Sequence, residues 1–194
     1  MKPVTALRLA PALALSLPLA VLLTGCSTPS ARPVSSAPSV SAAAPSLPGA
    51  TATDTGWIQL LIPMDDQAEE LLALAADRGS SPAVATWATG LAKAHRSELA
   101  TLRPLLHRMG LPDTNVHQGH DMPGMVTESD LTRGRRLTGA AFDRFVLREL
   151  RDHLGHSRRV SRSAARSAGS SEVRRLASGI ADTRADQLKS LPGR

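Results

Sequence analysis

The chain has 194 residues, of which 42% are hydrophobic but only 2% aromatic, and 23 basic against 17 acidic residues give a formal net charge of +6. This length suits one folded domain with additional segments rather than two full domains. With so few aromatic residues a core must be built from aliphatic side chains, which favours helices over a sheet. The single Cys excludes an internal disulfide framework and a cysteine-cluster metal site.

Residues 1–25 are typical of a signal peptide for export. Lys2 and Arg8 form a basic start, and an apolar stretch follows over residues 9–23, too short and wrongly flanked for a membrane span. The segment resembles a bacterial lipobox in its ending Leu23-Thr24-Gly25-Cys26. This resemblance implies cleavage before Cys26 and attachment of lipid to its sulfur, so we expect a protein anchored to the outer face of the cell membrane. An ordinary signal peptide with a chance Cys is the alternative.

Residues 26–56 are predicted to be a flexible tether. Between residues 27 and 56 the chain consists mainly of Ser, Ala, Pro, Thr and Val, with only Arg32 and Asp54 charged. Such a stretch buries too little apolar surface to offset the entropy of ordering it. As a flexible chain it would span about 30 Å.

Helical periodicity begins at Trp57 and defines a domain over residues 57–194. Ser81-Pro82 is a typical helix start, and Thr127 with Asp130 is typical of the cap of a short helix. Pro104 lies inside a predicted helix and is expected to kink it. Four long helices are predicted over residues 58–77, 82–109, 139–168 and 172–191.

The two predicted hairpins resemble each other. Residues 83–102 align with residues 172–191 at an offset of 89, with six identities in twenty positions. A duplicated helical hairpin indicates an all-α fold, specifically a four-helix bundle.

Three segments stand out by their order and spacing: Leu61-Ile62-Pro63, Met122-Pro123-Gly124-Met125-Val126-Thr127 and Thr138-Gly139-Ala140-Ala141-Phe142-Asp143-Arg144. Through them the chain resembles, over about residues 57–191, the domain of unknown function 305 family. This resemblance implies a ferritin-like bundle in an exported bacterial protein. The resemblance implies a His-His pair in the first and third long helices, and copper binding in some members. Here the corresponding positions read Met64-Asp65 and His153-Leu154, so three of the four histidines are missing.

A polar layer is predicted in the middle of the bundle. In residues 84–109 an apolar stripe steps by four and three residues, and His95 and Glu98 fall on it. Asp65, His153 and Arg184 lie at similar distances from their own turns, about 22 Å along the bundle. If the hairpins pack in register, one internal layer contains Asp65, His95, Glu98, His153, Arg184 and Gln187.

Two interpretations of this layer stay open. It is either a buried network of paired charges or a metal or small-ligand site formed by Asp65, His95, Glu98 and His153. The cationic Arg184 favours the first. A ferritin-type di-iron centre is excluded, because no Glu in the chain is followed three residues later by His.

A second candidate metal site lies in the loop after residue 110. The loop places imidazole and thioether groups within nine residues, which suits copper and Cu(I) especially. The predicted ligands are His117, His120, Met122 and Met125. The alternative is a polar loop whose methionines pack on the end of the bundle.

Basic residues are concentrated in the second hairpin. In residues 139–168 they recur at helical spacing as Arg144, Arg148, Arg151, Arg158, Arg162 and Arg166, with Arg159 beside them. A solvated face partly paired with Asp66, Glu69 and Glu70 is one interpretation. Contact with anionic lipid or wall polymer is the other. Nucleic acid is not expected as a partner, because stacking aromatics are few.

Together these features predict a lipid-anchored extracytoplasmic binding module, with copper as the candidate ligand. A structural or partner-binding envelope protein with a charge-paired core is the alternative. An enzyme is not expected, because the sequence contains no nucleophile–base motif, phosphate-binding loop or adequate metal triad.

Overall fold

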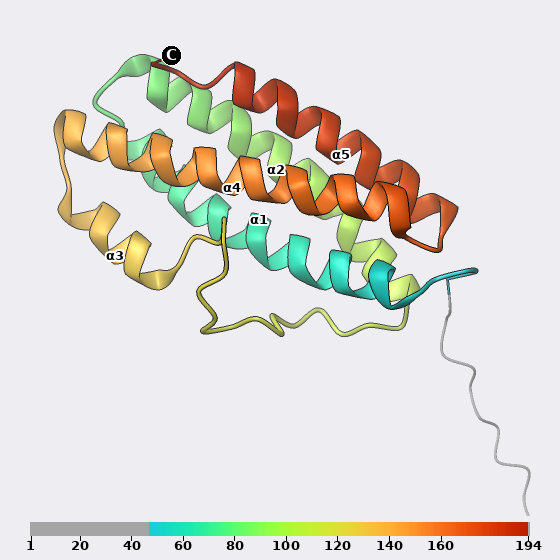
Figure 1. Ribbon diagram of the computed structural model, residues 1–194. Helices are drawn as coiled ribbons and strands as arrows, with labels where there is room; N and C mark the ends of the chain where they lie inside the picture. The colour runs from blue at the N-terminus through green and yellow to red at the C-terminus, as the bar shows by residue number, and fades with distance from the viewer. Residues whose placement is uncertain (1–46, 194) are drawn as a thin grey trace, which may run out of the picture. The chain divides into compact units, whose positions relative to one another are not determined.

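The computed structural model describes residues 47–193, which are helical and contain no strand. The helices are α1 (Ala52–Arg78), α2 (Pro82–Arg108), α3 (Glu128–Arg136), α4 (Gly139–Ser167) and α5 (Ser171–Lys189). α1 packs along α2 and α4, α4 packs along α5, and the short α3 contacts α1 and α4 (Figure 1). The predicted signal peptide, Cys26 and most of the predicted tether lie outside the described residues. Within residues 47–193, no helix is long and apolar enough to cross a membrane.

The long helices end within about two residues of their predicted ends, but α1 begins earlier than predicted. It starts at Ala52 instead of residue 58, because Thr51 caps it and Asp54 accepts a hydrogen bond from the Thr51 amide (2.8 Å). The last residues predicted as tether are therefore helical. The Ser/Ala-rich composition concealed this cap, since a cap is set by two residues rather than by average polarity.

The predicted short helix is confirmed as α3. The Thr127 amide donates to Asp130 Oδ2 (2.9 Å), and the Asp130 amide donates back to Thr127 Oγ1 (3.2 Å). This reciprocal capping satisfies two backbone donors at the helix start. Pro82 occupies the first turn of α2 as predicted, and both α1 and α2 contain an internal proline, Pro63 and Pro104.

Two aspartates tie each hairpin to the turn of the other. The Asp54 carboxylate accepts hydrogen bonds from the backbone amides of residues 169 and 170 (2.8 and 3.0 Å), and Asp143 accepts from the amides of residues 80 and 81 (2.9 and 3.0 Å). Burial opposes their ionisation, but the hydrogen bonds outweigh it and lower the pKa of both carboxyl groups. The two aspartates are 89 residues apart, which is the predicted repeat offset, so the equivalence extends beyond the aligned segments.

The hydrophobic core is divided into two clusters along the bundle. One contains Leu71, Leu72 and Phe142, and the other contains Ile58 and Leu105. On α1 the second cluster ends at Ile62 and the first begins at Ala68, with Asp65 between them. The interruption falls at the same level on the other long helices. The core therefore has a polar layer between two apolar halves.

Candidate functional site

The polar layer brings together side chains from all four long helices. It contains the six residues predicted for it, namely Asp65, His95, Glu98, His153, Arg184 and Gln187. Asp65, His95, His153 and Arg184 are completely buried at 0% exposure, and Glu98 and Gln187 are partly buried. The register expected from the turns is therefore the register found.

Arg184 organises the carboxylates of the layer. Its Nη2 donates to Asp65 Oδ1 (2.7 Å) and to Glu98 Oε1 (2.8 Å), and its Nη1 donates to Glu98 Oε2 (3.0 Å). Nη1 also donates to Gln187 Oε1 (3.1 Å), and Nε donates to Ser157 Oγ (3.0 Å). All three nitrogens are thus engaged, as a buried guanidinium requires.

The two histidines present the same ring nitrogen to the centre of the layer. His95 Nδ1 lies 3.2 Å from the carbonyl oxygen of Leu91, and His153 Nδ1 lies 3.3 Å from that of Gly124. Because a carbonyl oxygen can only accept, each Nδ1 carries a hydrogen, and each neutral ring then has its lone pair on Nε2. The two Nε2 atoms are 2.9 Å apart and lie 3.6 and 3.4 Å from Asp65 Oδ1.

Electrostatics keep both imidazoles neutral. Burial, reinforced by the Arg184 guanidinium, lowers the pKa of His95 well below its ordinary value and lowers the pKa of His153 to about 3. Burial, reinforced by the neighbouring Asp65 carboxylate, raises the pKa of Glu98 to about 8. At pH 7 Glu98 therefore holds a proton. Burial also raises the pKa of Asp65, and the Arg184 guanidinium opposes that rise.

One oxygen of the layer lacks a conventional donor. Asp65 Oδ2 is buried and accepts no hydrogen bond from a nitrogen or hydroxyl donor of residues 47–193. Three electron-pair donors, Asp65 with the two Nε2 atoms, thus converge within 4.8 Å of one another. Such an arrangement needs a proton or a cation between its members.

Residues that sequence patterning did not single out complete the layer. Ser157 lies one helical turn after His153, and its position on the buried face of α4 was the available signal. The Gly124 carbonyl could not be anticipated, because it comes from the loop before α3. Gly124 has φ +80°, and a Cβ there would lie 2.4 Å from His156 Cβ. A glycine is therefore required for the loop to approach α4 and orient His153.

The four predicted loop ligands differ in burial. The rings of His117 and His120 have centroids 6.5 Å apart. His120 is exposed and His117 half-buried, whereas Met125 is buried at 7% exposure and Met122 is half-buried. The burial of Met125 agrees with the alternative in which loop methionines pack on the bundle.

The interpretation in which the arginines of residues 139–168 pair with Asp66, Glu69 and Glu70 is wrong. Asp66 instead pairs with Arg103 (2.8 Å) and Glu69 with Arg96 (3.9 Å), both on α2. The reason is tertiary: these carboxylates lie along the α2 side of α1, whereas the stripe faces away from the core on α4.

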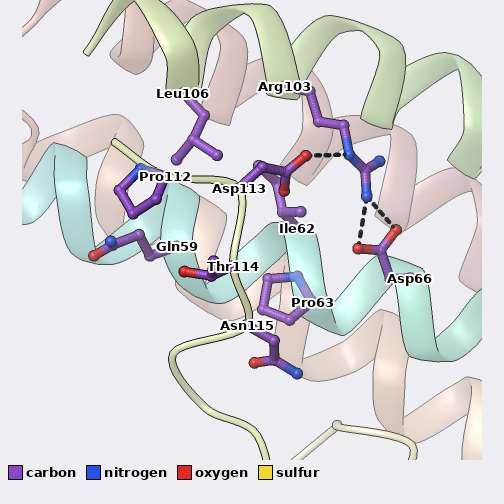
Figure 2. Close-up of a pocket in the computed structure, with 10 residues that line it drawn as sticks. All are labelled: Gln59, Ile62, Pro63, Asp66, Arg103, Leu106, Pro112, Asp113, Thr114 and Asn115. Carbon is purple, nitrogen blue, oxygen red and sulfur yellow. Dashed lines mark hydrogen bonds and ion pairs between the residues drawn. The ribbon is translucent and has the colours of Figure 1, made fainter. Parts of the chain in front are cut away.

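Two cavities lie beside the loop that follows α2. In the smaller one, of about 190 Å³, Arg103 bridges Asp66 of α1 and Asp113 of the loop (Figure 2). The larger one, of about 820 Å³, is lined by residues of α1, α3 and the loop, including Glu70 and His120. Neither cavity is lined by a residue of the polar layer, so the convergent donors sit in the closed core.

Comparison with known proteins agrees with the fold and the sequence resemblance. The structure is similar to a DUF305 fragment from Deinococcus radiodurans, with a TM-score of 0.66 and 21% identity over 74% of this chain and 95% of that one. It is also similar to a putative secreted protein DUF305 from Streptomyces coelicolor, with a TM-score of 0.64 and 19% identity over 72% of this chain and 89% of that one. Among curated proteins no match was found. The model of the domain of unknown function DUF305 matches residues 54–193, and the chain therefore belongs to the DUF305 family.

Proposed function

We propose that this protein is an extracytoplasmic, lipid-anchored binding module whose ferritin-like four-helix bundle holds one transition-metal ion in its polar layer. The ligands would be Asp65, His95 and His153. The lipobox-like sequence ending in Cys26 supports the anchor, and the secreted-protein description of the Streptomyces coelicolor neighbour is consistent with export.

The observation that carries the metal proposal is the orientation of the two imidazoles. A histidine that binds a metal through one ring nitrogen commonly donates the other N–H to a carbonyl or carboxylate, which fixes the ring. His95 and His153 both do so through Nδ1, and their Nε2 lone pairs meet at Asp65. Because their lowered pKa values keep them neutral, both rings are ready to bind a metal without first losing a proton.

The donor set favours a divalent ion. Two imidazole nitrogens and one carboxylate oxygen suit Cu²⁺, Zn²⁺ and Fe²⁺, and the general order of affinities puts Cu²⁺ first among them. Cu(I) fits less well, since none of these three ligands is a thioether or a thiolate. Copper is thus proposed as Cu²⁺ in the bundle rather than as Cu(I) in the loop.

The burial of the site supports binding rather than catalysis. All three proposed ligands are completely buried, and neither described cavity reaches them. A substrate would have no space beside the ion. We therefore propose a non-catalytic role in holding a metal.

A structural role of the layer is the competing proposal. The Nε2–Nε2 distance of 2.9 Å between His95 and His153 is also the length of an N–H···N hydrogen bond. If one proton were shared there and Glu98 were ionised, the negative charges of Asp65 and Glu98 would balance the positive charges of Arg184 and the imidazolium. The layer would then be a charge-paired core in a structural or partner-binding envelope protein.

Metal titration separates the two proposals. The chain from Ser27 is titrated with Cu²⁺ and Zn²⁺ by calorimetry, and the Cu²⁺ form is examined by electron paramagnetic resonance for coupling to two nitrogens. We expect one ion per chain. Below pH 8 the affinity should rise with pH by about tenfold per unit, because the bound ion displaces the proton of Glu98.

Matched variants locate the site. His153→Gln should weaken binding at least 100-fold, whereas His156→Gln, on the same helix but bonded to its own backbone through Asp152, should leave binding unchanged. If the parent binds neither ion at micromolar concentration, the metal proposal is refuted and the charge-paired core stands. If replacing all four loop residues by Ala abolishes binding and His153→Gln does not, the site is in the loop.

The anchor is tested separately. Cells expressing the full chain are labelled with a fatty acid, and the chain is compared with its Cys26→Ser variant. Incorporation into the parent alone supports lipidation of Cys26. A parent that takes up no label overturns the anchor without affecting the metal proposal.

A further inference from the structure

The outer face of α4 is a continuous cationic surface. Seven arginines fall within an arc of about 100° around the helix and extend over about 33 Å of its length. We call this set the arginine face: Arg144, Arg148, Arg151, Arg158, Arg159, Arg162 and Arg166. All are exposed except Arg158, which is half-buried. The buried residues of α4 lie on the opposite side of the helix.

This surface is almost unneutralised. Within residues 47–193, the only ion pair of the arginine face joins Arg148 to Glu149 (2.7 Å). Asp152 flanks the face but forms no ion pair with it among the described residues. The third acidic residue of α4, Asp143, is buried against the α1–α2 turn. Six unpaired guanidiniums on one side of a helix repel one another unless an external anion is present.

The chain enters the bundle at one end of the same surface. Leu47 packs on the core, and residues 49–51 lie against Gly169, where a Cβ would come within 2.2 Å of the Gly49 oxygen. Gly169 follows Arg166 by three residues, in the turn after α4. Residues 49–51 therefore lie beside the end of the arginine face.

The shape of the surface favours a flat partner over a threaded polymer. None of the seven arginines lines either of the two cavities described above. A polymer chain is usually held in a groove, whereas a membrane surface requires only a straight row of charges. Nor does this face carry aromatic side chains on which nucleic-acid bases could stack, since Phe142 and Phe145 are both buried.

We propose that the arginine face of α4 docks the domain, with its helices parallel to the surface, on the anionic phospholipid headgroups of the membrane. The inference goes beyond the proposed metal site and requires neither the metal nor the acyl chain. The proposed anchor enters only in the choice of lipid as the partner.

Vesicle sedimentation tests this proposal. The chain from Ser27 is used without acylation; it retains the whole described bundle, whose two hydrophobic clusters lie entirely within residues 47–193. It is mixed with vesicles of phosphatidylcholine alone or with 30% phosphatidylglycerol. The face variant combines Arg151→Gln, Arg162→Gln and Arg166→Gln. The matched control removes three exposed cations from other helices through Lys93→Gln, Arg136→Gln and Arg175→Gln.

We expect binding to the anionic vesicles only. Each basic residue near an anionic surface strengthens binding about fivefold, so the face variant should bind about 100-fold more weakly. The control variant should lose less than about fivefold, although its net charge changes equally. Failure to bind anionic vesicles, equal losses in both variants, or binding to an acidic wall polymer but not to vesicles would each overturn the proposal. If the chain binds anionic vesicles but Cys26 takes up no fatty-acid label, the docking proposal stands and the anchor is refuted.

Discussion

Removal of Arg184 should destabilise the bundle strongly and in a pH-dependent way. In Arg184→Met, Asp65 loses the guanidinium 2.7 Å from its Oδ1 and becomes an uncompensated buried charge. Protonation of Asp65 is the change that removes this charge at the lowest cost in free energy. Holding a carboxyl group of ordinary pKa 3.8 neutral at pH 7 costs about 4 kcal/mol, and at pH 5 about 1.6 kcal/mol. The value at pH 7 agrees with the roughly 3–5 kcal/mol known for breaking buried ion pairs.

Thermal denaturation at pH 5 and pH 7 measures this effect. At about 3 °C per kcal/mol, the melting temperature should fall by about 12 °C at pH 7 and by less than half as much at pH 5. Arg103→Met is the matched control, because Arg103 also bridges two carboxylates, those of Asp66 and Asp113, but is 35% exposed. Its loss should cost at most about 1 kcal/mol at either pH.

A second substitution tests whether the uncompensated charge of Asp65 causes this loss of stability. Asp65→Asn in the Arg184→Met background removes the uncompensated charge and should recover most of the lost stability at pH 7. A cost below 1 kcal/mol for Arg184→Met, or a cost that is equal at both pH values, would refute the account of the layer as a charge-balanced network.

Three further predictions concern the surroundings of the layer. Between pH 3 and 6.5 the unfolded chain takes up a proton on His153 that the folded chain excludes, so the free energy of unfolding falls as pH falls. In denaturant titrations, His153→Gln should reduce the slope of that free energy against pH by about 1.4 kcal/mol per pH unit. Gly124→Ala should cost about 3 kcal/mol through its clash and positive φ, whereas Gly119→Ala, also at φ +80° but with open space around it, should cost about 1 kcal/mol; equal costs would contradict the close approach of the loop to α4. Asp143→Ala removes the acceptor of the amides of residues 80 and 81 in the turn before α2 and should cost about 2 kcal/mol in thermal unfolding; a neutral result would count against the tie between the hairpins.

The polar layer shows how far sequence patterning extends into the site. His95 and Glu98 interrupt an apolar stripe, and counting residues from each turn placed Asp65, His153 and Arg184 at their level. Residues equally far from a turn lie at the same level because the rise per residue of a helix is constant and hairpins with short turns keep their register. Ring orientation is different, because it depends on which carbonyl lies beside each Nδ1. For His153 that carbonyl belongs to Gly124, 29 residues away.

The loop and the surface charges show the opposite limit. The close spacing of His117, His120, Met122 and Met125 along the chain indicates a candidate copper site, which stays a prediction, because an irregular loop has no periodicity that relates sequence distance to distance in space. Likewise, the partners of Asp66 and Glu69 turned out to be Arg103 and Arg96, because helix rotation within the bundle decides which charges meet.

Composition and periodicity by themselves determined an all-α chain built from a repeated hairpin, with its long helices, its capped short helix and a row of arginines on one of them. These features follow from local physics: few aromatics, caps of two residues and a 3.6-residue period. Only the tertiary structure decided that the donors of Asp65, His95 and His153 converge and that Arg184 pairs with their carboxylate. It also decided that six of the seven arginines of the arginine face have no ion pair within residues 47–193. Those outcomes depend on side chains from separate helices meeting in one place, and no single segment specifies that.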